Sequence, residues 1–378
     1  MKIFVTGLTS SSPGGMQYHN LGNYIIAEPL FKELRETFPE ADISTGMQLS
    51  DDFYKRFNIQ HLTQKRFFSY GLKTGLATFG DICRVFAWKL IRVKSLLSSP
   101  MLNEIRSSDL VIDFSGDIYG DNAKWTSFLE TNARLWFALM LKKKTAMIIG
   151  SPGPFSVFWR QWIAKRILHR LSLITNREPL STAMLAYIGI KGDKILTTAC
   201  PSVLFEPATE ESMKSSEDYS IIFEDKRPTI GIILCGWNMP SGPYNKWPRE
   251  DSEFSSFLQL VLFIKEKTDY RVCLMSHQNS TTPNGSLVKG NDHRIIDKLI
   301  EILGDRYDGD KIFTLKGLYD AAQSKAIIGQ FDLLVSGRIH GAVQGCLNAF
   351  QQSFSTMAMS LKLISYLDLV SFTIGHLL

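Results

Sequence analysis

The chain has 378 residues, of which 44% are hydrophobic and 21% are charged, and its formal net charge is +5. This length suffices for about two domains with substantial cores, and 24 Phe, 12 Tyr and 7 Trp exclude a disordered chain. The small, dispersed positive charge permits an anionic ligand but does not indicate binding to nucleic acid.

Cysteine usage and the amino terminus indicate a cytoplasmic protein. The five cysteines are far apart, odd in number and without a CxxC pair, which disfavours a disulfide framework or a zinc cluster and favours a reducing cytosol. The first residues, MKIFVTGL, do not have the apolar region of a signal peptide. No apolar run approaches the roughly 20 residues that cross a bilayer.

Short β-rich runs alternate with helical stretches in the first part of the chain. The run KIFVTG (2–7) predicts a buried strand, followed by a glycine-rich loop and a helix over 25–38. The pattern then predicts strands at 109–116, 145–151 and 171–175, and helices at about 82–97, 124–141 and 157–172.

The alternation stops at a polar stretch after residue 206, which we interpret as a linker, and then starts again. Strands are predicted at 229–236, 270–277, 311–315 and 331–337, and helices at 251–267, 292–303 and 318–328. Two blocks of alternating strands and helices indicate an α/β protein with two Rossmann-like parallel-sheet domains facing a cleft. We assign residues 1–206 to the first domain and 218–378 to the second.

Several predicted strands end in small or polar residues. In open parallel sheets, ligands bind beyond the carboxyl ends of the strands, where small residues let backbone N–H groups approach an anion. A single such end is explained equally well by a tight turn, but five ends in two halves favour an active site between the domains. These ends are Gly7, Ser115–Gly116–Asp117, Gly150–Ser151, Gly236 and Ser336–Gly337.

The segment FDLLVSGRIHG (331–341) is the most informative. A predicted buried strand stops at Gly337 and places Arg338 and His340 at its carboxyl end. The Arg338 guanidinium offers a planar fork of donors for phosphate or carboxylate, and an imidazole can move a proton near neutral pH. The alternative is a surface arginine beside a hydrogen-bonded structural histidine.

Three other segments are weaker candidates. The loop at 10–24 contains Gly14, Gly15, Asn20 and Gly22, but its spacing matches neither GxGxxG nor a P-loop, and a flexible loop explains it equally well. Arg177, with the glutamate that follows it, is either a second anion-binding residue or a structural ion pair. The basic stretch 84–97 is either a solvated helix face or a contact with an anionic membrane or polymer.

Taken together, these segments resemble the polysaccharide pyruvyl transferase family. The features that carry the resemblance are the loop at 14–22, SDLVIDFSGD at 108–117, IIGSPGPF at 148–155, TNREPLS at 175–181, TTACPSVLFEP at 197–207 and SGRIHGA at 336–342. The resemblance implies a GT-B-like fold and transfer of a pyruvyl group from phosphoenolpyruvate to a sugar hydroxyl of a cell-surface polysaccharide, such as an exopolysaccharide, or its lipid-linked precursor. It implies no metal or other cofactor, with phosphoenolpyruvate as co-substrate.

The resemblance also suggests roles for particular residues. Arg338 would bind the anionic donor and His340 would be the acid–base catalyst, with Arg177, Gly236 and Gly337 on the donor side. The acceptor side would contain the loop residues and the end of the strand at 109–116. These acceptor residues are Gly14, Gly15, Asn20, Gly22, Ser115, Gly116 and Asp117.

The sequence after RIHGAVQG departs from what the resemblance implies, which is a helix, a proline-led strand and a lysine-containing loop. We hypothesise that residues 346–378 are out of frame. With suitable codons, Cys346–Ser365 read one nucleotide earlier gives PERIPTVILDYGHEPKAHK, which contains a strand-like IPTVILDYG. Loss of that strand would put catalysis in doubt.

Two other functions are alternatives to pyruvyl transfer. One is a GT-B glycosyltransferase that uses a nucleotide sugar, although no acidic residue suited to a ribose follows the RIHG turn. The other is an inactive, truncated family member that keeps a sugar-binding domain.

Overall fold

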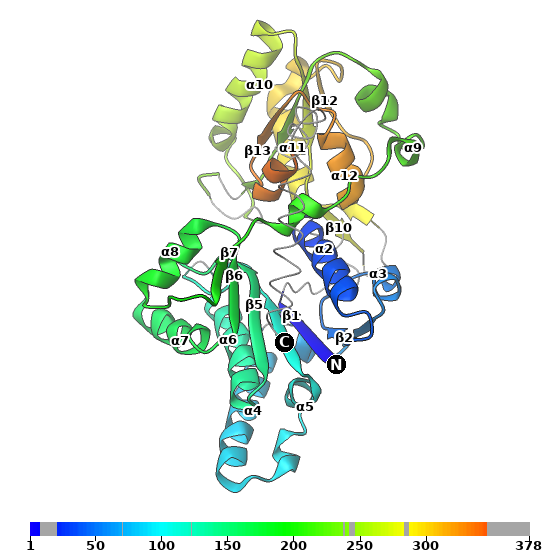
Figure 1. Cartoon of the computed structure of the whole chain (residues 1–378). Helices are drawn as coiled ribbons and strands as arrows, with labels where there is room; N and C mark the ends of the chain where they lie inside the picture. Colours follow the sequence, from blue (N-terminus) through cyan, green and yellow to red (C-terminus); the bar gives the residue numbers. More distant parts are fainter. Residues whose placement is uncertain are drawn as a thin grey trace. The chain divides into compact units, whose positions relative to one another are not determined.

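The computed structural model describes residues 1–7, 21–69, 71–121, 123–236, 239–241, 246–282 and 287–345. These residues form two compact units (Figure 1). Unit 1 contains residues 1–7 and 30–200, and unit 2 contains residues 21–29 and 201–345. The helix α2 (Leu21–Thr37) therefore contributes its first turns to unit 2 and the remainder to unit 1.

Unit 1 is built on a parallel sheet with the strand order β3-β2-β1-β4-β5-β6-β7. Runs of buried apolar residues on the central strands fit a sheet that is covered on both faces. The strands are β1 (Lys2–Gly7), β2 (Asp42–Thr45), β3 (Ile59–His61), β4 (Leu110–Phe114), β5 (Lys144–Gly150), β6 (Leu173–Asn176) and β7 (Ile195–Thr197).

The helices of unit 1 begin at recognisable capping residues in several cases. The hydroxyls of Ser50 and Ser99 accept hydrogen bonds from backbone N–H groups at the starts of α3 and α5, and Pro100 and Pro179 occupy the first turns of α5 and α8. The helices are α3 (Asp51–Arg56), α4 (Leu72–Ile91), α5 (Pro100–Ser107), α6 (Trp125–Met140), α7 (Phe158–Leu168) and α8 (Pro179–Tyr187), with short turns η1 (Lys65–Phe67) and η2 (Lys94–Leu97).

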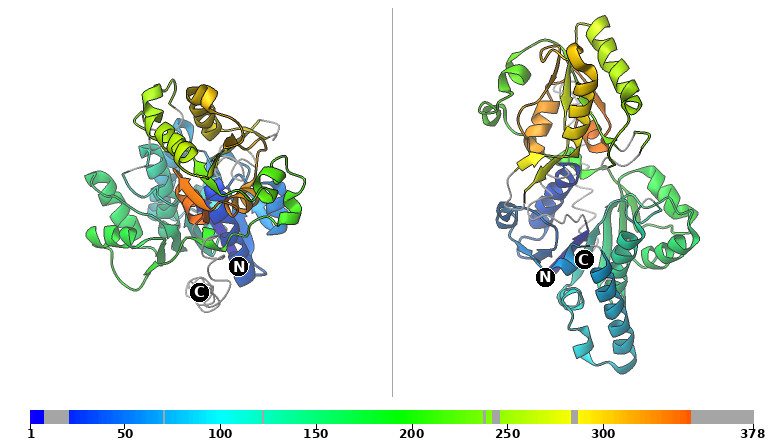
Figure 2. Two further views of the ribbon diagram at one scale, coloured as in Figure 1. Left: turned by 90° about the horizontal axis from the view of Figure 1, so that it is seen from above. Right: turned by 180° about the vertical axis from the view of Figure 1, so that it is seen from behind.

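Unit 2 contains a four-stranded parallel sheet with the order β12-β9-β8-β13, and a separate antiparallel pair β10-β11. Alternate residues of β8 and β9 face two different cores, so α10 and α11 cover one face of the sheet and α12 covers the other (Figure 2). The strands are β8 (Thr229–Ile233), β9 (Arg271–Met275), β10 (Asn279–Thr281), β11 (Leu287–Lys289), β12 (Ile312–Thr314) and β13 (Leu333–Ser336). The helices are α9 (Glu210–Met213), α10 (Ser255–Lys267), α11 (Asn291–Leu303) and α12 (Ala321–Ile328), with short turns η3 (Pro201–Leu204), η4 (Ser220–Glu224), η6 (Asp251–Phe254) and η7 (Gly304–Arg306).

The polar stretch after residue 206 and the strand at 331–337 differ from the sequence-based expectations. The polar stretch that we interpreted as a linker contains α9, and Met213 is buried with Ile222 and Phe223 in the core of unit 2. The last strand, β13, is not buried among the described residues, because Leu333 is 55% and Val335 is 39% exposed. Within the described residues β13 pairs with β8 alone and forms one edge of the sheet.

None of the helices in the described part of the chain has both the length and the apolar character needed to cross a bilayer.

Candidate active site

The turn after β13 brings Arg338 to the carboxyl end of the sheet in unit 2. The Ser336 hydroxyl accepts a hydrogen bond from the Arg338 backbone N–H at 3.1 Å and donates one to the Arg338 carbonyl at 2.8 Å. A Cβ atom on Gly337 would lie 3.1 Å from the Cβ of Cys235, so the turn packs closely on the chain that follows β8. A larger residue at this position would need the Cys235 side chain to shift by a few tenths of an ångström.

The Arg338 guanidinium is held by a buried ion pair. Its Nε donates to Oδ2 of Asp292 at 2.7 Å, and its Nη2 donates to Oδ1 at 2.6 Å. Nη2 also donates to Oε1 of Gln278 at 2.8 Å. Asp292 lies in the first turn of α11 and is fully buried, which raises the pKa of its carboxyl, while the hydrogen bonds and charge of Arg338 oppose that rise. The geometry fixes the plane of the guanidinium.

A second buried group, His277, joins this network. Its backbone N–H donates to Oδ2 of Asp292 at 3.1 Å, and its Nε2 lies 3.1 Å from Oε1 of Gln344. Burial and, to a smaller extent, the nearby charge of Arg338 lower the pKa of the His277 imidazole to about 4. His277 is therefore neutral near pH 7 and connects the end of β9 to α11 and to the helical turn that contains Gln344.

His340 lies against the first turn of α2 within unit 2. A Cβ atom on Gly22 would be only 2.4 Å from Nδ1 of His340 and 2.9 Å from its Cγ. Only glycine leaves room for the imidazole in this arrangement. The structure thus brings together Gly22 and His340, which come from opposite ends of the sequence and which we predicted on the acceptor side and in catalysis.

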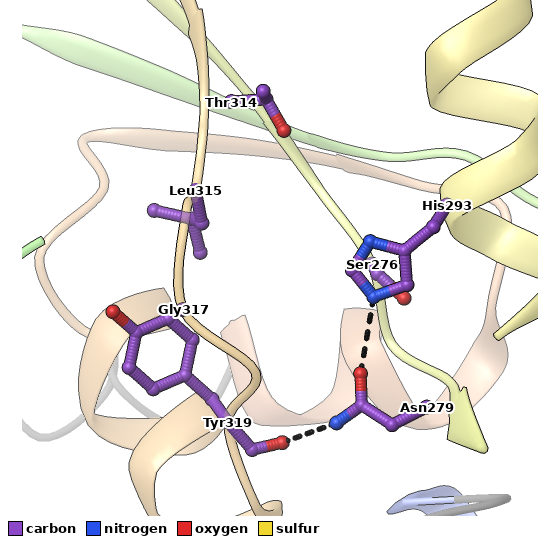
Figure 3. A pocket seen from close by; sticks show the side chains of 7 residues that line it. All are labelled: Ser276, Asn279, His293, Thr314, Leu315, Gly317 and Tyr319. Carbon is purple, nitrogen blue, oxygen red and sulfur yellow. Dashed lines mark hydrogen bonds between the residues drawn. The ribbon is translucent and has the colours of Figure 1, made fainter. Parts of the chain in front are cut away.

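A small polar hollow lies at the carboxyl ends of β9 and β12 (Figure 3). Nε2 of His293 lies 3.1 Å from Oδ1 of Asn279, whose Nδ2 donates to the Tyr319 carbonyl at 2.7 Å. Burial lowers the pKa of His293 to about 4, so it is neutral near pH 7. The hollow, of about 250 Å³ including open solvent, is lined by Ser276, Asn279, His293, Thr314, Leu315, Gly317 and Tyr319.

In unit 1, the predicted acceptor residues follow β4. The backbone N–H and hydroxyl of Ser115 donate to the Asp113 carboxyl at 3.0 and 2.9 Å, and the Tyr119 hydroxyl also donates to it. Asp113 is fully buried, which raises its pKa to about 6. Ser115 is itself buried, while Gly116 has φ +65° and Asp117 is exposed. The Ser115 side chain therefore supports the turn.

Arg177 follows β6 and contacts residues at the ends of neighbouring strands in unit 1. Its Nε donates to the Ser151 hydroxyl at 2.6 Å and lies 3.7 Å from Oε2 of Glu178. The Ser151 hydroxyl donates to Glu178 at 3.1 Å, and its backbone N–H donates to the Gly116 carbonyl at 3.0 Å. The carboxyl ends of β4, β5 and β6 thus bring Gly116, Ser151 and Arg177 to one edge of the sheet.

The remaining predicted residues lie elsewhere. Gly236 is buried, and its carbonyl accepts a hydrogen bond from the Met239 N–H at 3.3 Å. Gly14, Gly15 and Asn20 lie outside the described residues, as does the segment 346–378. Among the described residues, no group of three or more His, Cys, Asp or Glu side chains is arranged to hold a metal ion.

Sequence reasoning did not find Asp292, Gln278 or His277 as partners of Arg338. A signal for two of them was present, since His277 is the last residue of the predicted strand at 270–277 and Gln278 follows it, where parallel sheets place their ligand-binding residues. Asp292 gave a weaker signal, because an acidic residue in the first turn of a helix is common for its interaction with the helix dipole.

The fold of the chain is GT-B-like, which confirms the predicted fold class. Similar solved structures include the UDP-GlcNAc 2-epimerase from Methanocaldococcus jannaschii, with a TM-score of 0.53 and 12% identity over 92% of this chain and 82% of that one. They also include the S. aureus MnaA–UDP co-structure, with a TM-score of 0.52 and 12% identity over 90% of this chain and 75% of that one. At such identities the likeness shows the fold alone.

The chain belongs to the polysaccharide pyruvyl transferase family, because the model of that family matches residues 20–349. The match includes the end of β4, the Arg177 turn and the whole RIHG turn. No curated protein matches the chain.

Proposed function

We propose that this protein transfers a pyruvyl group from phosphoenolpyruvate to a hydroxyl of a saccharide that belongs to a cell-surface polysaccharide or its lipid-linked precursor. Membership of the polysaccharide pyruvyl transferase family over residues 20–349 carries the proposal. The geometry of the RIHG turn supports it, because Arg338 and His340 lie at the carboxyl end of a parallel sheet, where such folds bind ligands.

Arg338 is the first candidate for binding the donor. Phosphoenolpyruvate carries a phosphate and a carboxylate, and a guanidinium matches either group better than an ammonium does. Asp292 and Gln278 hold the Arg338 guanidinium in one orientation, so little of its freedom remains to be lost on binding. Arg177 of unit 1 is the second candidate for the donor.

His340 is the candidate acid. Protonation of the methylene carbon of phosphoenolpyruvate by an imidazolium draws the electron pair of the C=C bond and leaves C2 electrophilic. A saccharide hydroxyl then forms a bond to C2 and loses its proton. A second hydroxyl adds as the phosphate leaves with the electron pair of its C–O bond, which gives a ketal and inorganic phosphate. An imidazole can donate and accept protons near neutral pH, which suits both the first and the later steps.

The proposal is tested by incubating the protein with phosphoenolpyruvate and a panel of saccharide acceptors, and by measuring phosphate release and the mass of the acceptor. We expect phosphate release that depends on the acceptor, together with the mass increase of one pyruvyl ketal. Release of a nucleotide from a UDP- or GDP-sugar, with no reaction of phosphoenolpyruvate, would instead indicate a glycosyltransferase. A folded chain that is silent with every donor would identify an inactive family member.

The Arg338→Lys variant tests the role of the guanidinium. We expect the KM for phosphoenolpyruvate to rise about tenfold or more, since an ammonium lacks the planar guanidinium that Asp292 and Gln278 hold in one orientation. The retained positive charge still compensates the buried Asp292 carboxylate, so we expect the chain to stay folded. Arg306→Lys is a matched control in the same unit, because Arg306 is exposed and donates only to carbonyls of its own turn among the bonds of the described residues. Equal KM values in both variants would assign Arg338 a structural role.

A further inference from the structure

The helix α4 in unit 1 buries a largely polar face and exposes an apolar one. Its buried residues are Thr74, Thr78, Asp81 and Val85, of which three are polar. Thr78 donates to the buried Glu130 of α6 at 2.7 Å, and Asp81 pairs with Arg66 and Arg84. An ordinary surface helix buries its apolar face and exposes its polar one.

The exposed side of α4 carries a continuous apolar stripe. Five large apolar side chains on this side are between 55% and 84% exposed: Leu72, Leu76, Phe79, Phe86 and Leu90. Together with the exposed Cys83, they follow one another at intervals that alternate between four and three residues. At about 100° per residue, these six side chains fall within roughly 80° of the helix circumference. Monomeric proteins rarely leave a contiguous apolar stripe of this length in water, so a partner covers it.

The charges beside the stripe are almost all positive. Residues 71–97 contain a single acidic residue, Asp81, which is buried and ion-paired. Five basic residues in the same stretch are exposed, and four of them lie toward its carboxyl end, where α4 is followed by η2 (Figure 1). They are Lys73, Arg84, Lys89, Arg92 and Lys94.

A second helix that packs on α6 also exposes aromatic residues. Both α4 and α7 contact α6, through Phe86 against Trp136 and through Phe128 against Trp159. On α7, Phe158 and Trp162 are exposed, and the Arg166 guanidinium lies 4.1 Å from the centre of the Trp162 ring. Tryptophan beside arginine is typical of surfaces at the interface between water and lipid.

We propose that the stripe on α4, with its basic flanks, docks on the surface of a bilayer that contains anionic lipid. An amphipathic helix with a basic polar side and Leu and Phe on the other side inserts its apolar face at the headgroup boundary, and each nearby basic residue adds attraction to anionic lipid. A second copy of the chain fits less well, because residues 71–97 of both copies would bring exposed basic side chains to the contact and no exposed acidic ones. This inference does not depend on the proposed catalytic reaction.

Vesicle flotation tests the proposal with the full chain. We expect binding to vesicles of phosphatidylcholine mixed with phosphatidylglycerol, weaker binding to phosphatidylcholine alone, and a loss of the difference at high salt. The triple variant Leu76→Ser, Phe79→Ser, Leu90→Ser should lower the partition coefficient at least about tenfold, because three apolar side chains no longer enter the lipid. The double variant Arg92→Glu, Lys94→Glu should remove the preference for anionic vesicles.

A matched control replaces three other exposed apolar residues, Leu180 and Tyr187 on α8 and Phe263 on α10, by serine. We expect this control to bind vesicles as the unchanged chain does. Absence of vesicle binding, or an equal loss in both triple variants, would overturn the proposal. Sedimentation that shows self-association, abolished by the α4 variant without any vesicle binding, would also overturn it and identify a second copy as the occupant.

Discussion

Gly22 is the residue at which the start of α2 meets the RIHG turn. Its hydrogen leaves space for the His340 imidazole, whose Nδ1 would otherwise lie 2.4 Å from a Cβ atom. The Cβ would also lie within 3.1 Å of the His340 Cγ and Cβ, so the whole imidazole would have to shift and not only its tip. A single methyl group at position 22 therefore acts on the proposed catalyst rather than on the fold.

We expect Gly22→Ala to lower kcat for pyruvyl transfer about 10- to 100-fold while the KM for phosphoenolpyruvate changes little, because a displaced imidazole loses its alignment with the reacting carbon. Steady-state kinetics of the two parameters provides the measurement. The control is Gly80→Ala in α4, where a Cβ would meet nothing within 4 Å. That variant should keep its kinetics and gain about 0.5–1 kcal/mol in unfolding free energy. An unchanged kcat in Gly22→Ala would argue against His340 as the acid.

At the scale of elements, β9, α11 and β13 meet through buried polar groups rather than through apolar contacts alone. Asp292 connects α11 to both the His277 backbone and the Arg338 guanidinium. A buried pair of this kind is sensitive to the loss of one partner, because the other charge is then left without compensation. The network therefore favours one arrangement of the donor-side turn.

The burial of His277 predicts a pH dependence of stability. Its pKa is about 4 in the folded chain and near 6.5 in an unfolded chain, so the unfolded state binds more protons between these values. The contribution of the neutral His277 to stability is therefore fully present above about pH 6.5. It is lost as the pH falls toward 4, by up to about 3 kcal/mol. Denaturant unfolding at several pH values should show that His277→Gln loses less unfolding free energy on acidification than the unchanged chain does.

His169→Gln supplies the control, because it replaces an exposed imidazole and leaves the buried network around His277 intact. The pKa of Asp113 in unit 1 is raised to about 6, so its contribution to stability falls as the pH rises from about 4 to 6. This pH dependence is opposite to that of His277. Because the two effects overlap in the unchanged chain, the pH dependence of its unfolding free energy is compared with that of the two variants. If His277→Gln and His169→Gln lose stability equally on acidification, His277 does not titrate as its burial implies.

The elements that sequence periodicity predicted are those with long apolar runs or strong helical spacing. KIFVTG and TIGIILCG became β1 and β8, and the amphipathic stretch at 292–303 became α11. The short strands β2, β3 and β7 and the hairpin β10-β11 were missed, since three or four residues carry too little pattern to separate a strand from a loop.

The site was predictable only in part, for a related reason. Arg338 was found because it follows a strand in a distinctive turn, whereas its partner Asp292 is 46 residues away and is joined to it by tertiary packing. The closeness of Gly22 and His340 depends on where α2 docks, which no local pattern specifies. The helical periodicity at 82–97 predicted an amphipathic helix, but only burial shows which face of α4 is inside.

At the scale of the whole molecule, the edge at β13 bears on the hypothesis that residues 346–378 are out of frame. Among the described residues, β13 pairs on one side with β8, and the exposed Leu333 and Val335 lie on a strand that we had expected to be buried. The family match extends to residue 349. An additional strand such as IPTVILDYG could pair with the edge that β13 forms among the described residues and cover part of these side chains.

We predict that a chain whose carboxyl terminus is read in the neighbouring frame from Cys346 is more stable and more active. Leu333 and Val335 are 55% and 39% exposed, so covering what remains of each side chain adds only about 0.7–1.5 kcal/mol, which corresponds to a rise of a few degrees in Tm. Calorimetry of the restored chain, beside a control with the same added residues in scrambled order, provides the measurement, and phosphate release from phosphoenolpyruvate reports activity. Sequencing of the coding DNA precedes both, because codons that cannot encode the alternative string refute the hypothesis. Equal Tm values for the restored and scrambled chains would show that the edge of β13 needs no further strand.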